Sequence, residues 1–115
     1  MPLHHVLAGQ YNRRVIIQKT AVGSDSEGSP KTIWAVVDTV WAKVEALTAQ
    51  ERVAAAQAQL DVTDSVTIRW RPDLVQAQIH NMRLLYGDRV LEIHDVISDE
   101  ARHVDLQFLC LEMII

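Results

Sequence analysis

The chain has 115 residues, a formal net charge of −4 and an apolar content of 49%, with Cys110 as its one cysteine. This composition excludes wholesale disorder, an internal disulfide and a generic, strongly basic nucleic-acid-binding protein. No apolar run approaches the ~20 residues of a membrane-spanning helix, and the start MPLHHVLAGQ lacks the pattern of a signal peptide. We therefore expect one domain over residues 1–115, outside the membrane and in a reducing compartment.

Residues 13–20 (RRVIIQKT) alternate in polarity, which is typical of a half-buried strand. Residues 21–30 (AVGSDSEGSP) are rich in glycine, serine and acidic residues, and this composition predicts a loop. The loop is longer than a hairpin needs, and long loops often carry function. Its candidate functional residues are Gly23, Ser24, Asp25, Glu27 and Gly28.

A second strand is predicted over residues 31–47, and it is too long to be flat. Trp34 and Trp41 are an odd number of residues apart, so a regular strand would place them on opposite faces. We expect a bulge or bend near Asp38 and Thr39 that brings both indoles inward.

The strand period then gives way to a helix over about residues 48–60. Thr48 and Glu51 have the spacing of a capping box, in which each side chain bonds the other residue's backbone N–H. The apolar face that follows is mostly alanine, which allows close approach to a neighbour. Two roles stay open for this helix: it covers one end of its own barrel, or it also packs between subunits.

Further strands are predicted at residues 66–70, 82–86, 90–94 and 104–110, and Gly87-Asp88 predicts a tight hairpin turn. We expect the apolar tail 113–115 to pair within the sheet or with a neighbour, because an unpaired apolar strand promotes aggregation. The predicted fold is mainly β, a small antiparallel β barrel of five or six strands with one inserted α-helix.

No constellation of catalytic, cofactor-binding or metal-binding residues occurs in the sequence. The five histidines are scattered without metal-ligand spacing, and Cys110 has no companion. A nucleic-acid function depends on Arg69-Trp70-Arg71 together with Trp34 and Trp41, because small barrels bind single strands by stacking bases on aromatics beside cations. The acidic net charge argues against this alternative.

One ordered series of short segments spans nearly the whole chain: 14–18 (RVIIQ), Gly28, Trp34, 40–44 (VWAKV), Glu51, 67–70 (TIRW), Met82-Arg83, Tyr86-Gly87 and 91–93 (LEI). In this order and spacing the chain resembles the head–tail joining family of tailed phages, also called head completion or head-closure proteins. Trp70 departs mildly from that family's pattern, in which a tyrosine often follows the Ile-Arg pair.

The resemblance implies a structural virion protein at the neck, assembled in the host cytoplasm, without enzymatic activity or cofactor. Such proteins form a ring, commonly a dodecamer, under the portal and join the DNA-filled head to the tail. The implied partners are further copies of the chain, the portal or connector, the tail or tail adaptor, and double-stranded DNA passing through the channel. The loop at residues 21–30 is then a candidate for docking or for the channel, and a tail terminator or adaptor is an alternative of the same class. Candidate subunit-interface residues are Trp41, Arg52, Val53, Ala56, Arg69 and Trp70.

Overall fold

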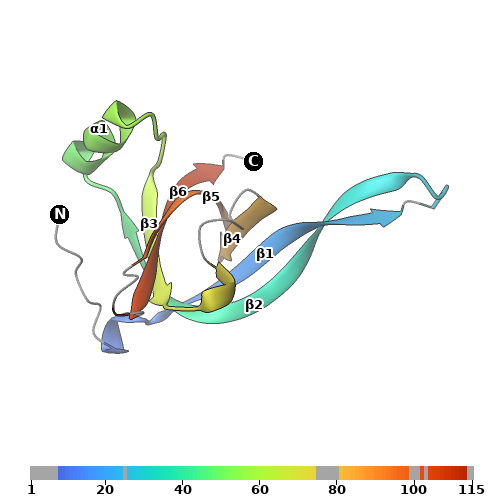
Figure 1. Cartoon of the computed structure of the whole chain (residues 1–115), viewed down its shortest axis with the longest axis horizontal. Coiled ribbons are helices and arrows are strands. Elements are labelled where there is room, and N and C mark those ends of the chain that lie inside the picture. The colour runs from blue at the N-terminus through green and yellow to red at the C-terminus, as the bar shows by residue number, and fades with distance from the viewer. Residues whose placement is uncertain (1–7, 25, 75–80, 99–101, 103, 114–115) are drawn as a thin grey trace.

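The computed structural model describes residues 8–24, 26–74, 81–98, 102 and 104–113. Within these ranges, six antiparallel strands form a closed barrel in the order β1-β2-β3-β6-β5-β4 (Figure 1). The predicted fold class is therefore confirmed. The elements are η1 (Ala8–Gln10), β1 (Arg13–Ser24), β2 (Pro30–Ala46), α1 (Ala49–Gln57), β3 (Asp64–Arg69), η2 (Pro72–Leu74), β4 (Met82–Tyr86), β5 (Arg89–Ser98) and β6 (Asp105–Met113).

The barrel interior is filled by apolar side chains that alternate along the strands, as the period of two requires. Phe108 from β6 is fully buried, together with Ile17 from β1 and Leu84 from β4. Trp70, Tyr86 and three valines are partly buried and pack against this cluster. The strands are therefore held by one apolar core whose members come from all six strands.

Strands β1 and β2 continue past the barrel as a two-stranded ribbon (Figure 1). We call residues 18–24 and 30–36, with the turn between them, the arm. Beyond its base, where Gln18 and Lys19 still pair with β4, β1 pairs with β2 alone. The arm points along the longest dimension of the molecule, whose principal extents are 51 × 28 × 26 Å.

The arm corrects the loop predicted over residues 21–30. Residues 21–24 belong to β1 and pair with residues 30–33 of β2, so the connection itself is only a five-residue turn. Loop-like composition was misleading here because the residues pair across the ribbon, and the small Gly23 lies beneath Ile33.

A β-bulge separates the arm from the barrel. Ile17 pairs with Asp38 and Gln18 pairs with Val36, so Val37 is an extra residue in β2. The predicted bulge is therefore present, one residue before the expected Asp38. The bulge places Trp34 and Trp41 on the same face of the sheet. Their partners on β1, Thr20 and Arg14, are an even number of residues apart, and such side chains lie on the same face of a strand.

That shared face is the outer one, so the prediction that both indoles point inward was wrong. Val15 and Ile17 fill the inner positions of β1 and are fully buried. Trp34 is 39% exposed and Trp41 is 53% exposed. The inner volume is already filled by aliphatic side chains and Phe108, which leaves the indoles on the surface.

Helix α1 begins with the predicted capping box. The Glu51 N–H donates to Thr48 Oγ1 at 3.2 Å, and the Thr48 N–H donates to Glu51 Oε1 at 3.0 Å. The helix ends at Gln57, three residues before the predicted end, because Gln59 adopts a left-handed φ of 63°. The N–H groups of Gln59 and Leu60 then bond carbonyls of the last turn, which is a Schellman ending.

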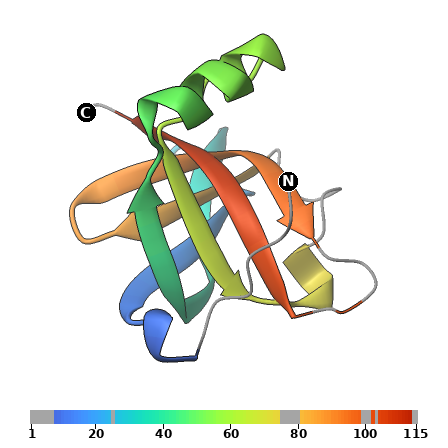
Figure 2. The same cartoon turned by 90° about the vertical axis from the view of Figure 1, so that its left-hand side faces the viewer.

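The helix stands at one end of the barrel, between β2 and β3 (Figure 2). None of its residues is buried. The Leu47 N–H donates to the Thr63 carbonyl at 2.9 Å and so joins the two ends of the segment that carries the helix. Within the described ranges, no helix has the length and hydropathy that a bilayer crossing requires.

The predicted hairpin turn at Gly87-Asp88 joins β4 to β5, and Gly87 has the positive φ, 59°, that the first position of a type II′ turn favours. Met113 pairs with Val90, so the described part of the apolar tail lies in the sheet as expected. The rest of the tail, residues 114–115, lies outside the described residues, as do residues 1–7 and 75–80.

Candidate functional site

The arm carries three large exposed apolar side chains along one face, while Ile33, 42% exposed, lies on the other face. Val22 is 84% exposed, Val36 is 62% exposed, and Trp34 lies between them on the same face by the register of the ribbon. Trp34 is held at the base of the arm by Arg83, whose guanidinium carbon lies 4.0 Å from the indole centroid. The arm is therefore an apolar projection anchored to β4.

The predicted loop residues lie at the far end of the arm. Gly23 and Ser24 end β1, and Glu27 and Gly28 are exposed in the turn. Gly28 has a φ of 84°, which favours glycine at this position. Asp25 lies outside the described residues. The tip is thus short and polar, in contrast to the apolar shaft of the arm.

Helix α1 contributes a second exposed surface, which we call the helix surface. The structure brings together the predicted Arg52, Val53 and Ala56 in one shallow hollow of about 360 Å³. Val53 is 59% exposed although it is the largest apolar side chain of the helix. The lining residues are Ala49, Arg52, Val53, Ala56, Leu60, Asp61 and Val62.

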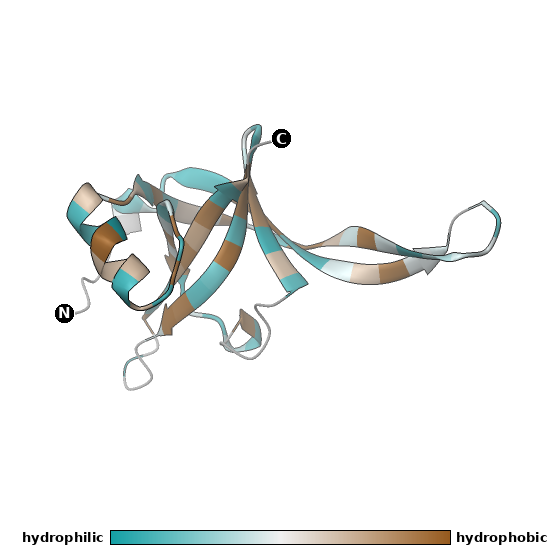
Figure 3. Ribbon diagram, turned by 90° about the horizontal axis from the view of Figure 1, so that it is seen from above, coloured by the Kyte–Doolittle hydropathy of each residue, from teal (hydrophilic) through white to brown (hydrophobic). Residues whose placement is uncertain are grey.

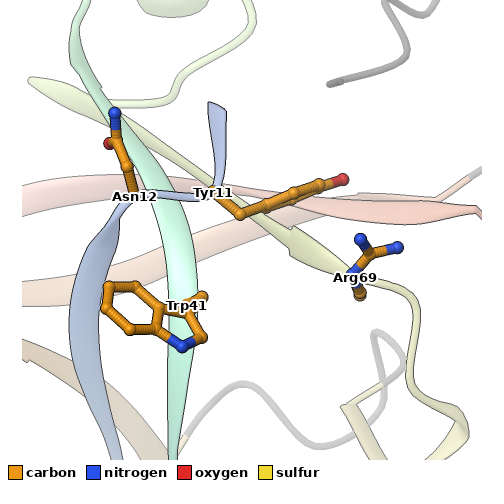
Figure 4. Close-up of a pocket in the computed structure, with 4 residues that line it drawn as sticks. All are labelled: Tyr11, Asn12, Trp41 and Arg69. Atoms are coloured by element: carbon orange, nitrogen blue, oxygen red, sulfur yellow. The ribbon is translucent and has the colours of Figure 1, made fainter. Parts of the chain in front are cut away.

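A third surface, the strand patch, lies on the outside of β1, β2 and β3 at the opposite end of the barrel. Arg14 stacks on Trp41 at 4.7 Å, and Arg69 stacks on Tyr11 at 5.1 Å. Figure 4 shows the Tyr11 side chain extending toward Arg69, with Asn12 and Trp41 beside it. These four residues line an open hollow of about 440 Å³.

The structure thus unites the predicted Trp41 and Arg69 in one patch and adds Tyr11, which sequence reasoning missed. The available signal was its position two residues before the predicted strand at residues 13–20, next to Arg13 and Arg14. Burial raises the pKa of Tyr11, as does the nearby Asp105, while Arg69 opposes the shift. The phenol is therefore neutral at pH 7.

Arg71 borders the strand patch but is neutralised. It donates to Asp38 at 2.6 Å and to Asp73 at 2.8 Å. The hydrogen bond from Arg71 lowers the pKa of Asp73. The hydrogen bonds to Asp73 and Asp38 raise the pKa of Arg71 in turn. Trp70, the remaining predicted interface residue, is half-buried against the core rather than part of the patch.

Metal binding and catalysis have little support among the described residues. They contain no group of three histidine, cysteine, aspartate or glutamate side chains suited to a metal ion. His94 lies 2.9 Å from Glu92 in an ordinary surface pair, and His4, His5, His80 and His103 are outside the described ranges. Cys110 is fully buried, and burial raises the pKa of its thiol far above the usual range.

Comparison with known proteins identifies the family. The model of a family described as phage head completion protein matches residues 6–113. Comparison with curated proteins finds no significant match.

Two solved structures share the fold. One is the solution structure of protein SF1141 from Shigella flexneri 2a, which is 26% identical, covers 93% of this chain and 96% of its own, and has a TM-score of 0.70. The other is a chain from the virion of a native gene transfer agent particle, 20% identical, covering 90% and 96%, with a TM-score of 0.58. At that identity, the second match shows the fold alone.

Proposed function

This chain belongs to the phage head completion protein family, a family of structural phage proteins, and from that premise we propose that it forms a ring beneath the portal and joins the DNA-filled head to the tail. The ring extends or closes the DNA channel at the virion neck. Its contacts are with further copies of itself, with the portal or connector, and with the tail or tail adaptor. The similar fold of a chain in a gene transfer agent virion agrees with this role.

The observation that carries the proposal is the arm. A ribbon that leaves the barrel with Val22 84% exposed and Val36 62% exposed is poorly suited to an isolated protein, because exposed apolar strands associate with other surfaces. An assembly protein uses such a surface to bind its neighbours. The helix surface and the strand patch supply further contacts, so Trp41, Arg52, Val53, Ala56 and Arg69 are our proposed interface residues.

The tip of the arm suits either the channel or a docking partner. By sequence it carries Asp25 and Glu27 and no cation between residues 24 and 30. Carboxylates repel the phosphates of double-stranded DNA and so allow it to pass without being gripped. We propose that residues 23–28 reach the channel wall or the adjoining portal or tail protein.

Deletion of the gene from the phage or prophage that encodes this chain tests the proposal. Electron microscopy of the lysate should show filled or leaking heads beside separate, complete tails. Normal virions would overturn the joining function, and so would a block in DNA replication or in packaging. Complementation with the wild-type gene should restore joined particles and serves as the control.

The strand patch favours a second candidate function, binding of single-stranded nucleic acid. It places Arg14 against the exposed ring of Trp41, as in stacking platforms, and Arg69 against the buried ring of Tyr11 beside it. This function predicts affinity for an oligonucleotide that falls steeply with salt and weakens by about 1–3 kcal/mol in Trp41→Ala. Absence of binding at low salt would eliminate it without affecting the joining function.

A further inference from the structure

Two elements of this structure are too small to be stable without support, and both leave apolar side chains in solvent. Helix α1 has nine residues and buries none of them, whereas isolated helices shorter than about 12 residues are marginal in water. The arm is a two-stranded ribbon, and such ribbons also need another surface for stability. Both elements therefore require a covering surface.

The arm and the helix lie at opposite ends of the long axis (Figure 1). Figure 3 shows that both elements carry strongly apolar residues, drawn in brown. A contact between two different surfaces of neighbouring copies is heterologous, and its repetition gives a ring when the rotation between copies closes and an open filament when it does not. An arm-to-arm contact would be isologous and would stop at a dimer.

Resting on the ring proposed above, we propose that the arm of each subunit lies across helix α1 of the next subunit. The apolar face of the arm, with Val22, Trp34 and Val36, packs on the hollow of the helix surface. The partner of this surface is thus a second copy of the same chain.

The sizes of the two surfaces agree. Helix α1 is about 13 Å long at the usual rise per residue, a length that about four strand residues span. The arm strands are seven residues each, so they extend past both ends of the helix. The hollow is lined mainly by small or short side chains such as Ala49, Ala56 and Val62, which admit close approach of a strand.

The two strands of the arm and the segment around helix α1 differ in charge, whereas the turn of the arm carries Asp25 and Glu27 and makes the arm as a whole neutral. The strands of the arm, residues 18–24 and 30–36, carry Lys19 and Lys31 and no carboxylate, a net charge of +2. Residues 45–61 carry three carboxylates and one arginine, a net charge of −2, and one of these carboxylates, Glu45, is already paired with Lys43 at 3.1 Å. Both lysines lie on the reverse face from Val22, so they act by attraction within the Debye length of about 8 Å rather than by direct pairing.

Cross-linking in purified particles tests the contact. The variant Val22→Cys, Val53→Cys is treated with a short bis-maleimide. The native Cys110 stays in place because it is fully buried and its thiol has a raised pKa. We expect a ladder of covalent oligomers of this chain from the double variant and no ladder from either single variant.

A matched control replaces the helix cysteine by Asp88→Cys, an exposed residue in the β4–β5 turn, and should give no ladder. If the first pair prevents assembly, Val36→Cys with Ala56→Cys repeats the test. Dimers from Val22→Cys alone would show an arm-to-arm contact and overturn the proposal. Adducts only with another virion protein, or no adducts, would also overturn it.

The result of the cross-linking test can be distinguished from the result of the gene deletion that tests the joining function. A missing ladder in particles whose heads and tails are joined overturns this contact alone. Joined particles in the absence of the gene overturn the joining function, whatever the cross-linking result.

Discussion

Arg83 and Trp34 meet across strand β1, although they belong to β4 and β2, which do not pair. The guanidinium carbon lies 4.0 Å from the indole centroid, and Arg83 Nε donates to Gln18 Oε1 at 2.8 Å on the intervening strand. One side chain thus ties three strands together at the point where the arm leaves the barrel.

Replacement of Arg83 by alanine should loosen the arm without unfolding the barrel. The lost cation–π contact and hydrogen bond reduce the local free energy of opening by about 1 kcal/mol. Amide hydrogen exchange should therefore quicken in residues 20–24 and 30–34. Lys19→Ala, on the reverse face of the arm, is the control and should leave exchange unchanged.

Removal of the helix cap should destabilise α1. Thr48→Ala loses the acceptor for the Glu51 N–H and should cost about 1 kcal/mol, read from amide exchange in the helix. Thr48→Ser keeps a hydroxyl at this position and should retain most of the protection. Equal protection in both variants would contradict a capping role.

The same box makes the helix sensitive to acid. The hydrogen bond from the Thr48 backbone N–H lowers the pKa of Glu51. A carboxylate with a lowered pKa stabilises the fold above its ordinary pKa of about 4.3, and this contribution is lost as pH falls through the folded value. Cα chemical shifts of the helix should move toward coil values below about pH 4, and less so in Glu51→Gln.

The end of the helix offers a stabilising substitution. Gln59 has a φ of 63°, which costs a residue with a Cβ about 1 kcal/mol and glycine almost nothing. Gln59→Gly should therefore raise the free energy of unfolding of the helix by about 0.5–1 kcal/mol. Gln57→Gly, inside the helix, is the matched control and should lower that free energy by about 1 kcal/mol.

Arg89 should be important for the stability of the barrel. It bonds Asp64, which is 3% exposed, at 2.9 Å and also pairs with Glu112. Arg89→Met leaves the Asp64 carboxylate buried without its cation and should cost about 3 kcal/mol in urea unfolding. Asp64→Asn combined with Arg89→Met should recover part of that loss. If the effects of the two changes on the free energy of unfolding simply add, the energetic coupling between Arg89 and Asp64 is contradicted.

The barrel, the capping box and the β4–β5 turn were predictable from sequence because each depends on local signals of period, spacing or glycine. The arm was not, because residues 21–24 have loop-like composition and become strand only through pairing with residues 30–33. The outward position of Trp34 and Trp41 was also inaccessible, since it depends on how the other strands fill the interior. Proximity of Tyr11 to Arg69 likewise depends on tertiary pairing, because β1 and β3 both pair with β2.

The extra residue at Val37 restricts how this protein can change over generations. Side chains alternate in a strand, so gain or loss of a single residue between the barrel and Trp34 would turn the apolar face of the arm to its reverse side. Changes of two residues in each strand preserve the faces and alter only the reach, by about 7 Å. Among descendants of this chain, arms of different length should therefore differ by even numbers of residues per strand.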